Sequence, residues 1–380
     1  MSRERCRILF VNSFDVRLID SKKTDGSVIS QLEEVMLKYK GLCDLLLFTG
    51  DTIKFDLTPP IEHLPSALFH KFGLWHLSYM LLGTFKIAKH LKGKSLVRGF
   101  NTGCPGAILA TKIKNKPSMV FYEYNWAYQV ANINKGKIFG AVAEVIENYV
   151  IRNADVIVAR HKSLEKEAYK RGAKRVVLIP YSVDEAVFKP GIAVEELKEF
   201  YNITDEKVLM YIGRLHPVKR LRLLLESVAK LQENFKMFIV GAGALEEELE
   251  EYAKLLGIND KVIFTGAVQF NDIPKYMNLA DVIVLTSAIE GQPRVIVESM
   301  FCGTPAVGTN VFGISDTIAD GVTGYLTSTD PEDIANKISK ALQDDQLSVA
   351  CREYALQNYS RETANSKELA IAKELLGWDD

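Results

Sequence analysis

The sequence lacks an excess of charge of either sign. Its 380 residues include 47 Lys and Arg and 48 Asp and Glu, which gives a formal net charge of −1 at pH 7. Domains that bind nucleic acid usually carry a marked positive charge, and a long-range field needs a net charge far from zero. We therefore expect no nucleic-acid partner.

Paired cysteines and a plausible metal cluster are lacking as well. The five cysteines include no C-x-x-C pair, which argues against a disulfide framework and a zinc site and fits a reducing cytoplasm. His63, His70 and His76 cannot share one helical face, and Pro65 interrupts any helix between the first two. The sequence therefore predicts neither a metal nor another cofactor.

A segment long enough to cross a membrane is also lacking in the first half. Its longest charge-free apolar run, residues 72–85 (FGLWHLSYMLLGTF), is shorter than the roughly 20 residues of a spanning helix. The N-terminal stretch MSRERCRILFVNSF has no signal-peptide profile. We expect a cytoplasmic protein in which this run packs on its own domain or lies on a membrane surface.

The sequence does contain an alternation of short apolar runs and longer amphipathic segments. Runs such as RILFVN, SMVFYEY, KVLMYIG and DVIVLTS are typical of buried strands, and VKRLRLLLESVAKLQENF is typical of a helix. Nearly continuous apolar strands joined by helices predict the α/β class, with parallel sheets covered on both faces.

The alternation falters once, between residues 183 and 206, and we place the join of two Rossmann-like domains there. The predicted domains are 1–190 and 191–360, and a helix over 361–380 is predicted to pack back on the first domain. Ligands of open α/β sheets bind at the carboxyl ends of the strands. Two such domains facing each other therefore predict a ligand-binding cleft between them.

The stretch IEGQPRVIVESM (289–300) carries two glutamates at the end of a predicted strand. Gly291 and Pro293 make an unbroken helix unfavourable, so Glu290 is expected on a loop and Glu298 on the following helix. The backbone N–H groups near the helix start are then available to an anion. Helix capping and surface charge are the alternative explanation, although an unpaired carboxylate at Glu298, among Val, Ile and Met, is costly.

A second polar stretch, YIGRLHPVKRL, follows the first strand of the second domain. Gly213 allows a tight turn, Arg214 is able to bind two phosphate oxygens, and Lys219 adds a positive charge near the next helix. Expulsion of a diphosphate requires such cations. Ordinary surface charges remain the alternative.

The stretch VGAGALEEEL resembles a dinucleotide fingerprint only superficially. Glu246 stands where the last glycine of that fingerprint belongs, and the stretch follows an internal strand. We interpret it as a turn with a helix beginning near Ala244.

Taken in order, GRL with Lys219, VGAG, E-x7-E, CGTPAVGTNVFGISDTI and DGVTGYL resemble the retaining glycosyltransferases of family 4, which have the GT-B fold. GAKRVVLIPYSVDEAVFKP is also typical of that family. The resemblance is dense from about 155 to 342 and looser before. It implies a GT-B architecture and a nucleotide-sugar donor in the second domain.

The resemblance implies a role for each matching position. Arg214 and Lys219 would hold the diphosphate, Glu290 would contact the sugar, Glu298 would accept hydrogen bonds from the ribose hydroxyls, and the loop around Val268 would lie against the base. The predicted catalytic residues are Glu290, Arg214 and Lys219, and the predicted donor-binding residues are Glu298, Gly213, Gly291, Arg294, Val295, Val268 and Gly26.

The first domain matches the family less well. Gly26, before a predicted helix, either approaches the diphosphate or belongs to a plain N-cap turn. Many members of the family have a histidine after the strand that corresponds to SMVFY, whereas this sequence has Glu123 and Asn125 there. Glu123, Asn125 and His161 are the candidate cleft or acceptor residues, and for His161 a capping or solvated role is the alternative.

We therefore predict an enzyme that transfers a sugar, with retention, from a nucleotide-diphosphate donor to a hydroxyl acceptor, either lipid-linked or a glycan. The sequence contains no D-x-D, so the metal-bound diphosphate of the other major glycosyltransferase fold is not expected. A sugar-nucleotide epimerase of the same architecture and a non-catalytic nucleotide-sugar-binding protein are the alternatives. Residues 64–94, rich in Leu, Phe and Lys, are predicted to contact the inner membrane face peripherally, near the acceptor.

Overall fold

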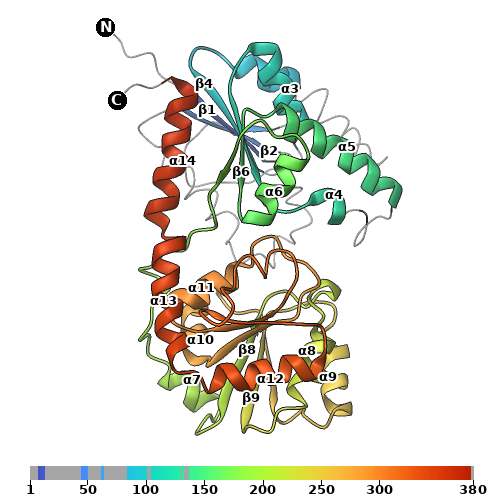
Figure 1. Ribbon diagram of the computed structural model, residues 1–380, viewed down its shortest axis with the longest axis vertical. Helices are drawn as coiled ribbons and strands as arrows, with labels where there is room; N and C mark the ends of the chain where they lie inside the picture. Colours follow the sequence, from blue (N-terminus) through green and yellow to red (C-terminus); the bar gives the residue numbers. More distant parts are fainter. Residues whose placement is uncertain are drawn as a thin grey trace. The chain divides into compact units, whose positions relative to one another are not determined.

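The computed structural model describes residues 7–12, 44–49, 61–63, 84–100, 104–129, 131 and 137–377. The chain divides into two compact units (Figure 1). Unit 1 comprises Met1–Ile179 and Asn365–Asp380, and unit 2 comprises Pro180–Ala364. Each is described by itself below.

The described part of unit 1 is built on a seven-stranded parallel sheet in the order β3-β2-β1-β4-β5-β6-β7. The strands are β1 (Arg7–Asn12), β2 (Asp44–Thr49), β3 (Ile61–His63), β4 (Ser95–Phe100), β5 (Ser118–Tyr122), β6 (Val156–Ala159) and β7 (Val176–Leu178). The helices are α3 (Pro105–Lys114), α4 (Trp126–Gln129), α5 (Lys137–Asn153), α6 (Lys162–Lys170) and most of α14 (Arg361–Leu376).

Unit 2 is built on a six-stranded parallel sheet in the order β10-β9-β8-β11-β12-β13. The strands are β8 (Lys207–Ile212), β9 (Phe235–Val240), β10 (Val262–Gly266), β11 (Val282–Leu285), β12 (Ala306–Thr309) and β13 (Gly324–Thr327). The α-helices are α7 (Glu195–Phe200), α8 (Leu221–Val228), α9 (Glu246–Leu255), α10 (Ile273–Leu279), α11 (Arg294–Cys302), α12 (Pro331–Leu342) and α13 (Gln346–Tyr359), with 3-10 turns η4 (Pro217–Lys219) and η5 (Phe270–Asp272).

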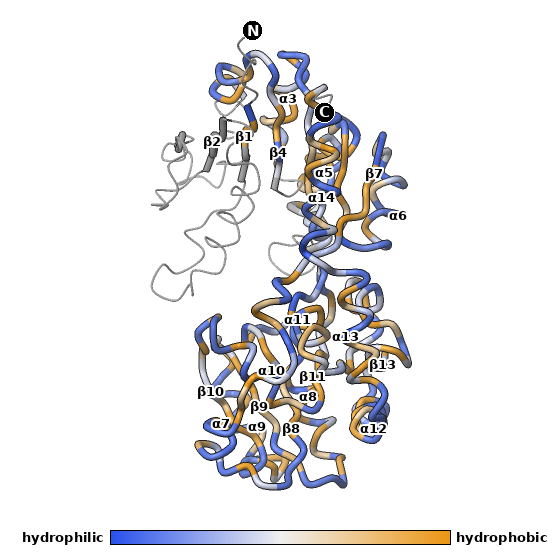
Figure 2. Tube along the Cα trace, turned by 90° about the vertical axis from the view of Figure 1, so that its left-hand side faces the viewer, coloured by the Kyte–Doolittle hydropathy of each residue, from blue (hydrophilic) through white to orange (hydrophobic). Residues whose placement is uncertain are grey.

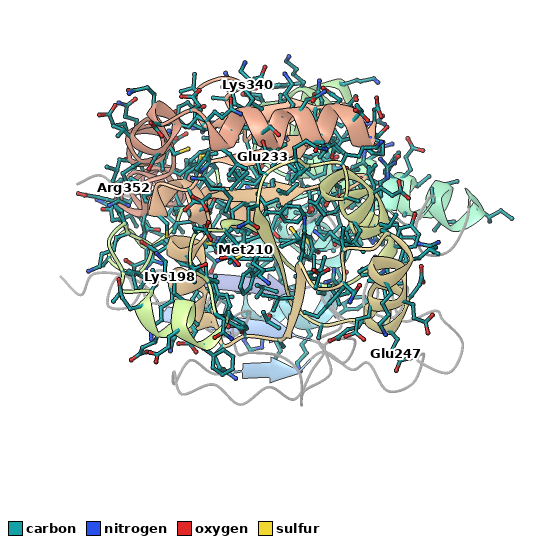
Figure 3. All side chains as sticks on the ribbon, turned by 90° about the horizontal axis from the view of Figure 1, so that it is seen from below. Lys198, Met210, Glu233, Glu247, Lys340 and Arg352 are labelled. Carbon is teal, nitrogen blue, oxygen red and sulfur yellow. The ribbon has the colours of Figure 1, made fainter. Side chains whose placement is uncertain are left out.

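Both faces of the sheet in unit 2 are covered, which explains its nearly continuous apolar strands. Along β8, Val208 and Met210 belong to the core that contains residues of α10, α11 and α13, whereas Leu209 and Tyr211 belong to the core that contains residues of α8, α9 and α12. Figure 3 shows Met210 in the interior of unit 2 and Lys340 at its periphery. Figure 2 colours the chain by hydropathy: the strands of unit 2 are mainly hydrophobic, whereas its helices combine hydrophobic and hydrophilic residues. The predicted α/β class with two parallel sheets is confirmed.

Two boundaries differ from the sequence-based expectation, the join between the domains and the start of α9. Residues 180–190, which the sequence places in the first domain, pack in unit 2, because Val183 and Phe188 are buried in its core. The last predicted helix, over 361–380, corresponds to α14, which begins at Arg361 after a break at Ser360, where the chain pairs with Val183. Helix α9 begins at Glu246 rather than near Ala244, and Pro293 is the N-cap residue of α11.

The last helix is attached to unit 1 by a buried ion pair. Arg98 of β4 donates from Nε to the Glu368 carboxylate of α14 at 2.7 Å, with both side chains nearly inaccessible. An exposed pair between Arg175 and Glu374 lies farther along α14. A charge buried at this depth is tolerated only when it is paired, so the Arg98–Glu368 contact fixes where α14 packs.

Candidate functional site

The predicted donor-site residues follow the carboxyl ends of strands in unit 2. Gly213 and Arg214 follow β8, Val268 follows β10, and Glu290 follows β11. Because the sheet is parallel, these ends lie along one edge. The loops that carry the residues are therefore neighbours at that edge, and Lys219 and Glu290 contact each other directly.

The loops after β8 and β9 pack backbone against backbone. This packing requires the two glycines of VGAG, Gly241 and Gly243. A Cβ on Gly241 would lie 2.0 Å from the carbonyl oxygen of Gly213, and a Cβ on Gly243 would lie 2.3 Å from that of Leu215. The N–H of Leu215 donates to the carbonyl of Ala242 at 3.1 Å. These glycines allow the close packing that supports the Gly213–Leu215 turn.

The central contact of the site joins Lys219 and Glu290. The Lys219 ammonium and the Glu290 Oε1 are 2.5 Å apart, and their side chains are 18% and 14% exposed. Ser287 also donates to this Oε1, at 2.6 Å. Within the described residues no hydrogen bond is made to Oε2 of Glu290, so that oxygen is available to a ligand hydroxyl.

The backbone around Glu290 is held from two sides. Ala288 donates from its N–H to the carbonyl of Val218 at 2.8 Å, and the Glu290 N–H donates to the carbonyl of Phe312 at 3.1 Å. Gly313 has φ +86°, and a Cβ there would lie 2.1 Å from the carbonyl oxygen of Gly291. The loop after β12 thus fits against the Glu290 loop only because residue 313 is glycine.

The start of α11 presents backbone N–H groups. Pro293 is the N-cap residue, and Arg294 begins the helix. Among the described residues, no hydrogen bond is donated by the N–H groups of Gly291, Gln292, Arg294 or Val295. Unpaired N–H groups at a helix start, together with the helix dipole, favour an anion.

Glu298 is almost fully buried, with 8% of its surface exposed. Burial raises the pKa of its carboxyl above the usual 4.5, and the Arg294 guanidinium opposes this rise. The nearest Arg294 nitrogen is 3.7 Å from Oε1, which is too far for a good hydrogen bond. A carboxylate that stays this poorly compensated inside a protein is better explained by a ligand than by stability.

Two other predicted residues of unit 2, Arg214 and Val268, are less buried than Glu298. Arg214 is exposed, and its carbonyl accepts a hydrogen bond from the Tyr211 hydroxyl at 2.8 Å. Burial, with Arg214 and Lys219 as further causes, lowers the pKa of His216. Near neutral pH His216 is thus uncharged, and its Nδ1 accepts from the Val218 N–H at 3.3 Å. Val268 is half-buried against the unit's core.

In unit 1, Glu123 directly follows β5 and Arg160 directly follows the neighbouring strand β6. Their side chains form an ion pair at 3.1 Å, with 16% and 12% exposed. Arg160 also donates to the carbonyl of Ile179 at 3.3 Å and lies over the Phe121 ring, 4.7 Å from its centroid. The Glu123 carboxylate is therefore held in place at the carboxyl edge of this sheet.

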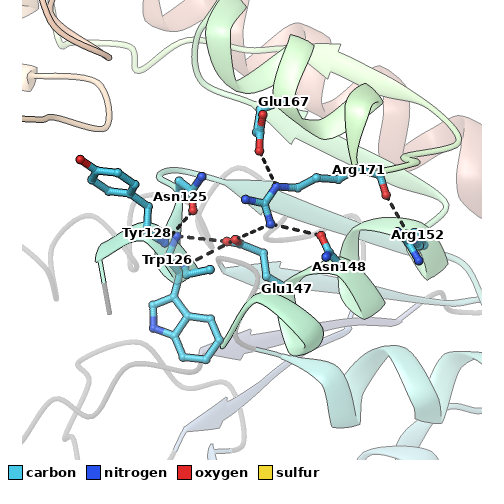
Figure 4. A network of polar contacts seen from close by, with 9 residues as sticks. Asn125, Trp126, Tyr128, Glu147, Asn148, Arg152, Glu167 and Arg171 are labelled. Atoms are coloured by element: carbon cyan, nitrogen blue, oxygen red, sulfur yellow. Dashed lines mark hydrogen bonds and ion pairs between the residues drawn. The ribbon is translucent and has the colours of Figure 1, made fainter. Parts of the chain in front are cut away.

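The residues that follow Glu123 are fixed by a second buried carboxylate, shown in Figure 4. Glu147 of α5 is fully buried, accepts a hydrogen bond from the Trp126 N–H at 3.1 Å and pairs with Arg171 at 3.1 Å. Asn125 accepts from the Tyr128 N–H at 2.9 Å. Asn125 therefore serves as a cap of the short helix α4, and this network fixes the backbone just after Glu123.

Two predicted candidates remain, His161 and Gly26. His161 is buried, with 4% exposed, at the N-cap position of α6, and Gly26 lies outside the described residues.

Sequence reasoning did not single out Ser287, Gln292, Gly313, Tyr181 or Arg160. Gln292, Gly313 and Tyr181 lie in quoted family segments, and Ser287 contacts Glu290 only three positions away, so a local signal existed for these four. The role of Arg160 depends on contacts distant in sequence. In the part of the chain that the structure describes, no group of three or more His, Cys, Asp or Glu residues is arranged to hold a metal ion.

Comparison with protein families and relatives gives consistent results. A family described as "Glycosyl transferases group 1" matches residues 193–358. N-acetyl-alpha-D-glucosaminyl L-malate synthase of Bacillus anthracis is 31% identical over 52% of this chain and 52% of its own length, so the match spans about half of that relative. GalNAc-alpha-(1->4)-GalNAc-alpha-(1->3)-diNAcBac-PP-undecaprenol alpha-1,4-N-acetyl-D-galactosaminyltransferase of Campylobacter jejuni is 30% identical over 70% of this chain and 69% of its own.

Solved structures resemble the whole chain. Sucrose-phosphate synthase of Thermosynechococcus elongatus matches with a TM-score of 0.79 and 18% identity, over 99% of this chain and 100% of its own. Anabaena HepE in complex with UDP matches with a TM-score of 0.80 and 19% identity, over 97% and 100%. At these identities the likeness concerns the fold, and the predicted fold is confirmed.

Proposed function

The chain belongs to the glycosyl transferases of group 1, and from that premise we propose that it is a retaining hexosyltransferase. It takes a sugar from a nucleotide-diphosphate donor and passes it to a hydroxyl acceptor, without a metal. The observation that carries this proposal is the Lys219–Glu290 pair beside the N–H groups at the start of α11, which donate to no acceptor in the described ranges.

The diphosphate, the sugar and the ribose of the donor would each meet a matching group at this edge of the sheet. The diphosphate would meet Lys219, Arg214 and the N–H groups, which supply the positive charge that a departing nucleoside diphosphate needs. The sugar hydroxyls would bind Oε2 of Glu290, and the ribose hydroxyls would bind Glu298. UDP is the first nucleotide to test, because a solved structure with the same fold is a complex with UDP.

The acceptor would be bound by unit 1. Glu123 is oriented by Arg160, and the Glu147 network fixes the backbone that follows it, so its carboxylate is prepared to accept a hydrogen bond from a hydroxyl. The Campylobacter jejuni relative is named for an acceptor linked to undecaprenol through PP. We propose a lipid-linked or glycan acceptor on this basis.

Peripheral membrane contact is part of the same proposal. None of the helices in the described ranges is long and apolar enough to cross a membrane. The segment proposed to touch the surface is 64–94, of which 64–83 lies outside those ranges. Flotation with anionic vesicles at low salt tests the contact, and a protein that stays entirely with the soluble fraction would rule it out.

The donor site is tested first by thermal shift with UDP, GDP, ADP and dTDP on the wild type and Glu298→Ala. A ligand at about a hundred times its Kd adds roughly 2.7 kcal/mol of stability. Stabilisation of the wild type by one nucleotide, reduced in the variant, is expected. Transfer is tested next: nucleoside diphosphate released only when an acceptor is present separates a transferase from an epimerase and from a non-catalytic binder.

A further inference from the structure

Tyr181 lies at the start of unit 2 and is attached to the donor loop by two contacts. Its backbone N–H donates to the side-chain oxygen of Gln292 at 2.6 Å, and Gln292 is 7% exposed. The ring of Tyr181 lies beneath the guanidinium of Arg294, with the carbon Cζ 5.2 Å from the ring centroid. The two contacts join residues about 110 positions apart: Gln292 lies on the loop before α11, and Arg294 is the first residue of that helix.

The position of Arg294 decides what Glu298 is able to bind. Arg294 and Glu298 are one helical turn apart, a spacing at which such side chains are able to form an ion pair, although the order with the cation first is the less favourable one. Here the nearest nitrogen stays 3.7 Å from the carboxylate, and Nε of Arg294 is buried with no hydrogen-bond partner among the described residues. The guanidinium thus lies over the Tyr181 ring, a favourable cation–π position, and makes no close hydrogen bond to Glu298.

We propose that Tyr181 and Gln292 are positioning residues of the donor site. Tyr181 keeps Arg294 from closing onto Glu298, so the Glu298 carboxylate stays available to the ribose hydroxyls of a nucleoside diphosphate. Gln292 fixes the loop to the backbone of Tyr181, which sets the direction of the N–H groups. The inference rests on the proposed function, since it requires that Glu298 binds the ribose.

The experiment compares UDP with 2′-deoxy-UDP by isothermal titration calorimetry on the full chain. Should the nucleotide panel identify another base, its diphosphate and the 2′-deoxy form are used. The wild type is expected to prefer the ribose form by about ten- to a hundredfold, the value of a hydrogen bond to a charged group. Tyr181→Phe keeps the ring and is expected to keep the preference.

Tyr181→Leu is expected to lose most of this preference, because Arg294 then closes onto Glu298. Adding Arg294→Met to Tyr181→Leu removes the competing cation and is expected to restore the preference, although overall affinity for the diphosphate falls. A purely structural role of Tyr181 would show no such restoration. Gln292→Leu is expected to weaken both nucleotides equally, since it disturbs the loop rather than the ribose contact.

Tyr252→Leu is the matched control, because Arg222 lies over the Tyr252 ring at 4.3 Å in a similar contact on α8 and α9. It is expected to change stability but not the preference for ribose. Equal preference in Tyr181→Leu and the wild type overturns the inference and leaves the proposed function intact. A wild type that binds no nucleoside diphosphate, or that does not distinguish the two sugars, overturns the inference together with the donor-site assignment on which it rests.

Discussion

Lys219 and Glu290 form an ion pair with Nζ and Oε1 2.5 Å apart, although 71 positions separate them in the chain. Lys219 ends the turn after β8, and Glu290 lies on the loop after β11, which is the next strand in the sheet. The proposed diphosphate-binding cation and the proposed sugar-binding carboxylate therefore neutralise and orient each other before any donor binds.

Lys219→Met is expected to lower kcat/KM by about ten- to a hundredfold, because it removes a charged donor from the departing diphosphate and releases the Glu290 carboxylate. Steady-state kinetics with the cognate donor measure the change. Lys207→Met is the control: Lys207 pairs with Asp281 at 3.6 Å, at the opposite end of β8, and both side chains are well exposed. Equal losses in the two variants would contradict the assigned role of Lys219.

Glu298→Gln is expected to stabilise the protein near neutral pH while weakening nucleotide binding. Burial raises the pKa of Glu298 above 4.5. Between the ordinary pKa of 4.5 in the unfolded state and the raised pKa in the folded state, the folded state binds more protons than the unfolded state. The wild type therefore loses stability as the pH rises through the raised pKa. The advantage of the glutamine variant should therefore disappear at a pH below 4.5, where the carboxyl is protonated in both states.

Urea unfolding at neutral and acidic pH measures this difference. Glu251→Gln, at an exposed position on α9, is the control and should show no comparable pH-dependent gain. A Glu298→Gln variant that is less stable than the wild type at neutral pH would mean that the carboxylate supports the fold rather than the ligand.

Gly313→Ala is expected to lower kcat/KM by up to about a hundredfold, because the new Cβ would displace the Gly291 carbonyl and with it the donor loop. Gly321 makes a matched comparison, since it also has a positive φ, +75°, but nothing lies within 4 Å of an added Cβ. In both alanine variants, the left-handed backbone conformation should lower the free energy of unfolding by about 1–2 kcal/mol. Only Gly313→Ala should lose activity beyond what this instability explains, as kinetics at a temperature well below both melting points will test.

Arg98→Met is expected to destabilise the protein by about 3–5 kcal/mol, because it removes the Arg98 guanidinium from the buried Glu368 carboxylate. Arg175→Met, which breaks the exposed pair with Glu374, should cost at most about 1 kcal/mol. Calorimetric unfolding compares the two. A double variant, Arg98→Met with Glu368→Leu, should regain much of the loss, and similar losses in both single variants would show that the buried pair does not anchor α14.

Several features were predictable because they depend on local pattern. Apolar runs such as KVLMYIG are buried on both faces of a sheet, so the strand and its parallel neighbours follow from composition and spacing alone. The break at Gly291 and Pro293 likewise separates the loop carrying Glu290 from the helix carrying Glu298, and the structure shows this division. The resemblance of the motifs to a glycosyltransferase family needed no coordinates either.

Other features were decided by tertiary packing alone. The contact of Tyr181 with Gln292, the pairing of Glu123 with Arg160, and the return of α14 to Arg98 join residues 111, 37 and 270 positions apart. No local periodicity encodes such pairs, because they arise only when strand order and helix packing bring distant segments to one edge. The sequence thus determined which chemical groups stand at the strand ends, and the tertiary structure determined which of those groups hold one another in place.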